Sequence, residues 1–269
     1  MNFCEPGSSG GCKTVKQFVL PFNPELADGK FAPIKLDGKA FHYLIRVRRC
    51  KRGNQLSAMA PNGLRFKLII QSIAADSCVV ELSQTGNGVE KHPETMITII
   101  PALIKNNRMD AAVRQAVEAG AAAIWPVQTA HGLIHATGNS NTRTERWKRI
   151  AVEALQQCGG TYAAEIEPPA ALPEVLKRWN SRGPIFFLHE KPLETGFTLH
   201  RLLADETTEL ALLTGPEGGF SESEVRLMET CGAKGIFLGE RILRSETAVL
   251  YGIAAVMTII RERKEWKLK

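Results

Sequence analysis

Two glycine-containing segments near the C-terminal end of the sequence have the residue types needed to hold a small ligand. Segment 215–219 reads GPEGG, and segment 239–244 reads GERILR. Glycines let backbone N–H groups approach a ligand because no Cβ stands in the way. The two arginines of the second segment can bind phosphate or the edges of nucleic-acid bases. Each segment also has a purely structural interpretation, as a sharp strand-to-helix turn and as a solvated charged turn.

The first segment does not match the common phosphate-binding patterns. It has neither the G-x-G-x-x-G spacing of dinucleotide-binding folds nor the G-x-x-x-x-G-K-[ST] spacing of the P-loop. The carboxylate of Glu217 would also repel a phosphate group. The segment therefore favours a ligand that is neutral or positively charged, and it disfavours a nicotinamide or nucleotide enzyme.

Both segments are predicted to lie where strands give way to helices. Ser221 and Glu224 have the spacing of a capping box, and Ser245 can cap the last helix. Short apolar strands that alternate with helices indicate an α/β domain with a mainly parallel sheet, which binds ligands beyond the carboxyl ends of its strands. The predicted strands are 95–103, 122–127, 184–189, 209–214 and 235–239, and the predicted helices are 108–120, 142–160, 171–179, 221–232 and 245–264.

The N-terminal part of the sequence predicts a small, mostly β unit. It has a short amphipathic helix at 39–47, where Phe41, Leu44, Ile45 and Val47 are predicted to share the buried face, and strands at 16–20, 55–60, 64–73 and 77–85. Pro61-Asn62-Gly63 separates two of these strands, and Asn-Gly in that position predicts a hairpin. The polar segment 85–94 is a natural linker. We therefore divide the chain into a flexible tail at 1–16, a β unit at 17–88 and an α/β domain at 89–269.

The composition of the 269 residues is that of an ordinary folded protein, with 44% hydrophobic and 23% charged residues. The net charge of +6 and the pI near 9.0 fit a polyanionic partner such as RNA or DNA, although many proteins are mildly basic. No apolar stretch has the length of a membrane span and no signal-peptide core is present, so we expect a cytoplasmic protein. Scattered cysteines without C-x-x-C spacing argue against a metal site and a disulfide framework; they are Cys4, Cys12, Cys50, Cys78, Cys158 and Cys231.

The residues around both glycine segments resemble a known signature. The stretches LLTGPEGGFSESEV (212–225) and FLGERILRSETA (237–248) are similar to the C-terminal signature of the RsmE family, the bacterial 16S ribosomal RNA uracil-N3 methyltransferases of the SPOUT class. Stretches at 40–56, 105–127 and 145–160 are similar to other segments of that family. The resemblance extends from about Gln17 to about Arg261.

The resemblance implies an N-terminal PUA-like β-barrel that helps to bind RNA, and a C-terminal α/β methyltransferase domain with a deep trefoil knot. It implies S-adenosylmethionine as the methyl donor, and a homodimer with active sites near the subunit interface. The implied reaction is methylation of N3 of one uridine in 16S ribosomal RNA of the small subunit. Two alternatives stay open: a SPOUT enzyme that modifies another RNA site, and an RNA-binding ribosome assembly protein without catalysis.

The resemblance also indicates which residues bind the donor. S-adenosylmethionine carries a sulfonium cation and no phosphate, which fits a glycine loop that bears an acid. Most of the expected contacts come from backbone groups, and His189 is expected in a third loop, with a surface-turn histidine as the alternative. The residues expected to bind the donor are Leu213, Gly215, Glu217, Gly218, Leu238, Gly239, Ile242, Leu243 and His189.

For the reaction itself, Arg244 is the predicted catalytic residue. N3 lies on the Watson–Crick edge, so the uracil must be unpaired or flipped out before N3 loses its proton. A cation near O2 or O4 stabilises the resulting anion, and Arg244 supplies one. Glu246 is predicted to orient Arg244 or to take the proton; the alternative is a first-turn glutamate that the helix dipole favours.

RNA binding is expected to be electrostatic. One basic cluster lies in the β unit, in segment 46–52, and a second lies in the α/β domain and comprises Arg143, Arg146, Lys148 and Arg149. Such clusters are usually only solvated faces, but an RNA substrate favours a binding role. The residues predicted to bind RNA are Arg46, Arg48, Arg49, Lys51, Arg52 and Arg241.

Two positions depart from the family pattern. Gly160 stands where the family usually has an arginine, and segment 129–133 reads TAHGL where the family often has Glu-Arg-Ser. His131 is a candidate hydrogen-bond donor in the second departure. Neither position lies in the two glycine segments, so donor binding is the firmer expectation.

Overall fold

The computed structural model describes residues 17–27, 30–61, 63–85, 95–132, 140–160, 162–192, 199–203 and 207–266. The chain divides into two compact units, residues 1–90 and 91–269, and each is described by itself. Several predicted features lie outside the described residues: the N-terminal tail with Cys4 and Cys12, Asn62 of the hairpin turn, most of the linker, and Leu133.

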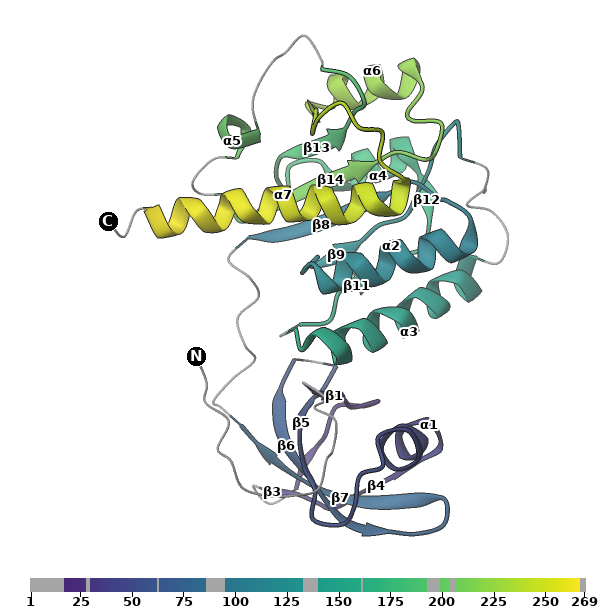
Figure 1. The fold of residues 1–269 in the computed structure, drawn as a ribbon, viewed down its shortest axis with the longest axis vertical. Helices are drawn as coiled ribbons and strands as arrows, with labels where there is room; N and C mark the ends of the chain where they lie inside the picture. Colours follow the sequence, from purple (N-terminus) through teal and green to yellow (C-terminus); the bar gives the residue numbers. More distant parts are fainter. Residues whose placement is uncertain are drawn as a thin grey trace. The chain divides into compact units, whose positions relative to one another are not determined.

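The first unit is built on a curled five-stranded sheet in the order β1-β5-β6-β7-β4 (Figure 1). Alternate residues of its longest strand, among them Phe66, Leu68 and Ile70, are fully buried, so one face of the sheet packs against the core. A bulge between Ile70 and Ser72 adds local twist. The strands are β1 (Phe18–Val19), β4 (Ile34–Asp37), β5 (Gln55–Met59), β6 (Arg65–Ile73) and β7 (Ser77–Gln84), and β2 (Leu26–Ala27) pairs separately with β3 (Lys30–Phe31).

The helix predicted at 39–47 is present, but in two parts. α1 (Gly38–Phe41) runs directly into a π-helical turn, η1 (His42–Val47). Phe41 and Leu44 are buried as the spacing predicts, whereas Val47 is 57% exposed. The prediction for Val47 is wrong because the wider turn of a π-helix changes the angular spacing of side chains.

The second unit contains a six-stranded sheet in the order β11-β9-β8-β14-β13-β15. Every pairing in it is parallel, so the predicted α/β class with a mainly parallel sheet is confirmed. The two central strands, β8 (Met96–Pro101) and β14 (Glu209–Thr214), are apolar and buried along nearly all their length, as strands covered on both faces must be. The other strands are β9 (Ala123–Ile124), β11 (Glu165–Ile166), β13 (Ile185–Leu188) and β15 (Lys234–Ile236).

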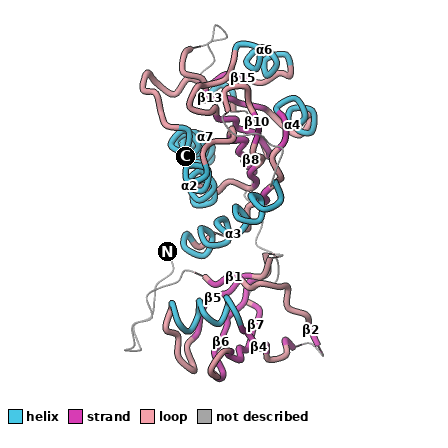
Figure 2. The backbone as a smooth tube through the Cα atoms, turned by 90° about the vertical axis from the view of Figure 1, so that its right-hand side faces the viewer, coloured by secondary structure: helices cyan, strands magenta, loops and turns pink. Residues whose placement is uncertain are grey.

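Helices lie on both sides of this sheet (Figure 2). α2 (Asn106–Glu118) and α7 (Ser245–Trp266) pack together on one side, and α4 (Leu172–Trp179) lies on the other. α2 ends as predicted, because Gly120 has a φ of 91° that a left-handed helix cap requires. The remaining helices are α3 (Ser140–Cys158), α5 (Leu199–Leu202) and α6 (Glu222–Thr230).

Two predicted strands differ from the structure. The strand predicted at 122–127 is interrupted: β9 ends at Ile124, and β10 (Val127–Gln128) leaves the main sheet to pair with β12 (Ala170–Ala171). Pro126 lies at the interruption, and proline has no N–H to continue a ladder. The last strand ends at Ile236 rather than Gly239, whose φ of 118° is incompatible with an L-residue strand. None of the helices in the described part of the chain has the length and hydropathy needed to cross a membrane.

Candidate functional site

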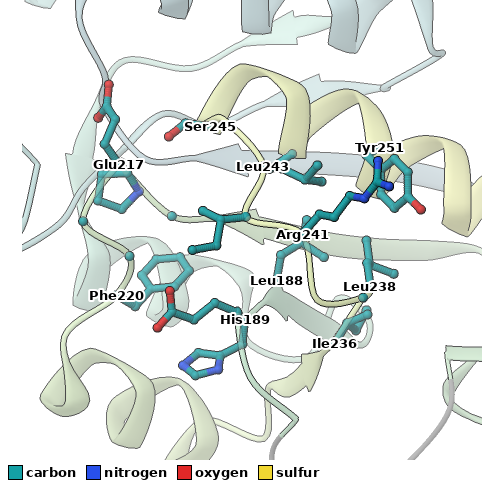
Figure 3. Close-up of a pocket in the computed structure, with 18 of the residues that line it drawn as sticks. Leu188, His189, Glu217, Phe220, Ile236, Leu238, Arg241, Leu243, Ser245 and Tyr251 are labelled. Carbon is teal, nitrogen blue, oxygen red and sulfur yellow. The ribbon is translucent and has the colours of Figure 1, made fainter.

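A pocket of about 700 Å³ opens at the carboxyl ends of β13 and β14 in the second unit (Figure 3). Residues 188–190 form one wall. Residues 215–220, here called the glycine loop, form a second, and residues from the segment 238–244, here called the arginine loop, form a third. The edge of a parallel sheet where these segments meet is the usual ligand site of α/β folds.

Most of the residues predicted to bind the donor line this pocket. Leu213 does not, because it is fully buried inside β14. Arg241, predicted to bind RNA, is part of the lining, whereas Arg244 and Glu246 are not. Several other residues of the lining have types that carry no signature and were not predicted. Three of them lie on one side of α7, and their spacing of three along the helix is the sequence signal that relates them: Ser245, Ala248 and Tyr251.

The glycine loop is held by side chains from distant parts of the sequence. Arg108 donates from Nη1 to Oε1 of Glu217 at 2.6 Å. His131 Nδ1 lies 3.0 Å from the carbonyl oxygen of Gly218 and 3.2 Å from that of Gly219. The ring of Phe220 meets the buried ring of Phe187 edge-on at 6.3 Å, which ties the loop to the core.

The pair with Arg108 changes what Glu217 offers a ligand. The sequence predicted that the carboxylate of Glu217 faces the donor. In the structure this carboxylate forms a salt bridge with the guanidinium of Arg108. The two side chains are 40% and 35% exposed, so the pair adds no more than about 1 kcal/mol to stability. Glu190 and Glu240 also line the pocket, are exposed, and have no ion-pair partner among the described residues.

α6 begins directly after the glycine loop with the predicted capping box, which is confirmed. Ser221 N donates to Oε2 of Glu224 at 2.8 Å, and the Ser221 side chain accepts from Glu224 N at 3.3 Å. The other oxygen of Glu224, Oε1, accepts from Ala130 N at 2.7 Å. One carboxylate therefore joins the start of α6 to the turn that carries His131.

The arginine loop has different surroundings. Glu240, Arg241 and Arg244 are exposed, and no other described residue forms a side-chain hydrogen bond or ion pair with any of them. Ile242 is 84% exposed, while Leu243 is half-buried at the pocket. In Figure 3 the guanidinium of Arg241 points toward Tyr251 on α7.

Glu246, in the first turn of α7, has one carboxylate oxygen, Oε2, that is buried without a hydrogen-bond partner among the described residues. Burying an unpaired carboxylate oxygen is costly, so such an atom often belongs to a functional group. No group of three or more metal-ligating side chains is found in the part of the chain that the structure describes.

Comparison with known proteins identifies the second unit. Residues 90–257 match the family described as the RNA methyltransferase domain. The chain belongs to this family. A ribosomal RNA small subunit methyltransferase E from Bacillus subtilis is 27% identical over 82% of this chain and 88% of its own length. The resemblance to the RsmE family is therefore confirmed.

Two solved structures share the fold of this RNA methyltransferase. A ribosomal RNA small subunit methyltransferase E from Neisseria gonorrhoeae, bound to S-adenosylmethionine, has a TM-score of 0.79 at 23% identity, over 91% of this chain and 98% of that one. A protein from Legionella pneumophila, in complex with the bound cofactor SAM, gives the same TM-score, identity and coverage. At this level of identity the comparison establishes the fold.

Proposed function

We propose that the protein is an S-adenosylmethionine-dependent methyltransferase that modifies N3 of a uridine in 16S ribosomal RNA of the small subunit, and that it acts in the cytoplasm. The observation that carries the proposal is the pocket between the glycine loop and the arginine loop. Family membership and the relatives named ribosomal RNA small subunit methyltransferase E support it.

The lining of the pocket fits the proposed methyl donor. Its volume of about 700 Å³ is in the usual range for small-molecule sites. Leu188, Ile236 and Leu243 offer apolar surface for an adenine ring, and Glu190 and Glu240 offer negative charge for the donor's cationic groups. Backbone groups of the glycine loop remain for polar contacts.

The proposed reaction assigns separate tasks to the chain's residues. S-adenosylmethionine supplies, when bound, an electrophilic methyl group to an in-line nucleophile. Arg244 is proposed to stabilise the uracil anion, since the residue is exposed, stands in the chain between the lining residues Leu243 and Ser245, and has no described side-chain partner. The unpartnered Oε2 of Glu246 is proposed to orient Arg244 or to accept the N3 proton.

RNA binding is proposed for Arg241 and for the basic cluster of the first unit, which comprises Arg46, Arg48, Arg49, Lys51 and Arg52. Lys51 and Arg52 are exposed, while Arg46 lies over the Phe41 ring at 5.8 Å. In the second basic cluster, Arg146 pairs with Asp110 and Lys148 with Glu145. Part of that cluster's charge is already engaged, whereas the side chains of Lys51 and Arg52 have no partner among the described residues, which favours these two as the RNA contact.

Three finer features of the family are also proposed for this chain. The curled five-stranded sheet supports a PUA-like barrel in the first unit, and the fold similarity supports a deep trefoil knot in the second. A homodimer is supported by large apolar side chains exposed beside the pocket: Ile242 (84%), Leu250 (39%) and Tyr251 (49%). Light scattering after size exclusion should report a dimer, and a monomer at micromolar concentration would contradict this part of the proposal.

A methyl-transfer assay tests the proposed function. The purified chain is incubated with labelled S-adenosylmethionine and small ribosomal subunits that lack the modification, and the labelled nucleoside is then identified. The expected product is 3-methyluridine. A different methylated nucleoside would favour a SPOUT enzyme with another target, and donor binding without any labelled RNA would favour a non-catalytic RNA-binding protein.

A further inference from the structure

We propose that His131 is a positioning residue for the methyl donor, because it holds the glycine loop in the conformation that the donor meets. The inference rests on the proposed function, since the ligand concerned is S-adenosylmethionine. His131 does not line the pocket, so it acts through the loop and not by touching the ligand.

The direction of the hydrogen bond follows from its acceptors. His131 Nδ1 lies 3.0 Å from the oxygen of Gly218 and 3.2 Å from the oxygen of Gly219. A carbonyl oxygen can only accept, so Nδ1 must carry the proton. Both the neutral Nδ1–H tautomer and the imidazolium carry one there. A single ring nitrogen thus orients two successive peptide groups.

This orientation leaves a donor group available to the ligand. In a trans peptide the carbonyl of Gly219 and the N–H of Phe220 point in opposite directions. Anchoring that carbonyl on His131 turns the N–H away from the histidine. The Phe220 N–H has no acceptor among the described residues, and Phe220 lines the pocket. Fixing the peptide therefore fixes a hydrogen-bond donor at the wall of the site.

The packing of Gly218 also depends on this histidine. A Cβ added to Gly218 would lie 3.1 Å from Cβ of His131, closer than side-chain carbons normally approach. Gly218 is therefore the residue type that lets the loop lie against His131. The requirement for glycine comes from the protein side of the loop, independently of the ligand.

The turn that carries His131 is itself anchored. Ala130 N donates to Glu224 Oε1 at 2.7 Å, and Gly132 N donates to the carbonyl of Thr129 at 3.1 Å. A positioning residue needs such support, because a mobile side chain cannot fix a loop. Segment 129–133 departs from the family pattern in sequence, and in this chain His131 of that segment fixes the glycine loop.

Donor affinity of three variants of the full chain tests the inference. His131→Leu removes the hydrogen bond and keeps the bulk. His131→Gln keeps a polar side chain but carries its amide beyond the Nδ1 position. His131→Asn places an amide N–H close to where Nδ1 stands. The control is His42→Leu, which changes an exposed histidine of the first unit.

Calorimetric titration with S-adenosylmethionine should show a Kd raised about tenfold for His131→Leu and His131→Gln, the loss expected for one hydrogen bond. His131→Asn should stay within about twofold of the unmodified chain, and the control should not change. In steady-state kinetics, KM for the donor should rise in His131→Leu while kcat and KM for RNA stay within about threefold. Thermal unfolding without donor verifies that each variant is folded.

The results separate this inference from the proposed function. If the unmodified chain does not bind S-adenosylmethionine, the proposed function fails, and the inference fails with it. If the unmodified chain binds and His131→Leu and His131→Gln bind equally well, only the inference is overturned. Equal losses in His131→Asn and His131→Leu would also overturn it, because the ring and not its N–H would then matter.

Discussion

The two loops that form the pocket differ in how the protein holds them. The glycine loop is fixed by Arg108, by His131 and by the packing of Phe220 on Phe187. The arginine loop presents Glu240, Arg241 and Arg244 to solvent, and none of the three has a side-chain partner among the described residues. The side chains that fix the glycine loop leave its Phe220 N–H available for a ligand, whereas the arginine loop leaves its charged side chains available.

This difference separates two tasks within one site. A loop that is fixed before the ligand arrives binds it at a lower entropic cost. A loop with unengaged arginines can contact a large, variable partner such as RNA and carry charge to the reacting base. We therefore assign donor affinity mainly to the glycine loop, and turnover and RNA contact mainly to the arginine loop.

Removing the charge of Arg244 should have the largest effect. Arg244→Ala is expected to lower the methyl-transfer rate about a hundredfold or more, because the uracil anion loses its stabilising cation. The affinity for S-adenosylmethionine should stay within about twofold, since Arg244 does not line the pocket. Single-turnover rates and calorimetry measure the two quantities. Arg244→Lys, which keeps the charge, should recover part of the rate; a full rate in Arg244→Ala would remove this residue from the mechanism.

Removing the brace at Arg108 should give the opposite pattern. Arg108→Ala is expected to raise the Kd for the donor by no more than about fivefold, because the glycine loop loses an exposed contact worth at most about 1 kcal/mol. The rate at saturating donor should change little. Arg226→Ala is the matched control, because it breaks a solvent-exposed pair with Glu222 on α6. Equal donor affinity in the two variants would show that the brace at Arg108 is not needed.

Weakening the helix cap behind the glycine loop should affect stability more than function. Ser221→Ala removes the side chain that caps α6 and is expected to lower the free energy of unfolding by about 1 kcal/mol. Ser223→Ala leaves the capping bond to the backbone in place and should cost less. Urea unfolding compares the two variants, and an equal loss in both would contradict the role given to Ser221.

Changing the basic cluster of the first unit should have the smallest effect, and should leave both loops untouched. Lys51→Ala is expected to weaken RNA binding about two- to threefold and to lower the slope of log K against log salt by about 1. The donor Kd should not change. Filter binding at several salt concentrations checks this, with Lys67→Ala, an exposed lysine of β6, as the control. An unchanged slope would remove Lys51 from the RNA contact.

The sequence predicts the loops of the site better than it predicts what holds them. The glycines and arginines of the two loops form local sequence patterns, each between an apolar strand and a helix, so they can be recognised from the sequence alone. The contacts from Arg108 to Glu217 and from His131 to Gly218 join residues 109 and 87 positions apart, so no local pattern reveals them. The break in the strand predicted at 122–127 did have a local signal, because Pro126 has no N–H to donate to a strand ladder.

Hydrogen–deuterium exchange with and without S-adenosylmethionine tests the contrast between the loops most directly. In the free protein, the amide of Gly219, which donates to the carbonyl of Pro216, should exchange more slowly than the amides of the arginine loop. Added donor should slow exchange in the arginine loop and at the Phe220 amide, which has no acceptor among the described residues. Equal, fast exchange in both loops of the free protein, or no change in either loop with saturating donor, would contradict the account.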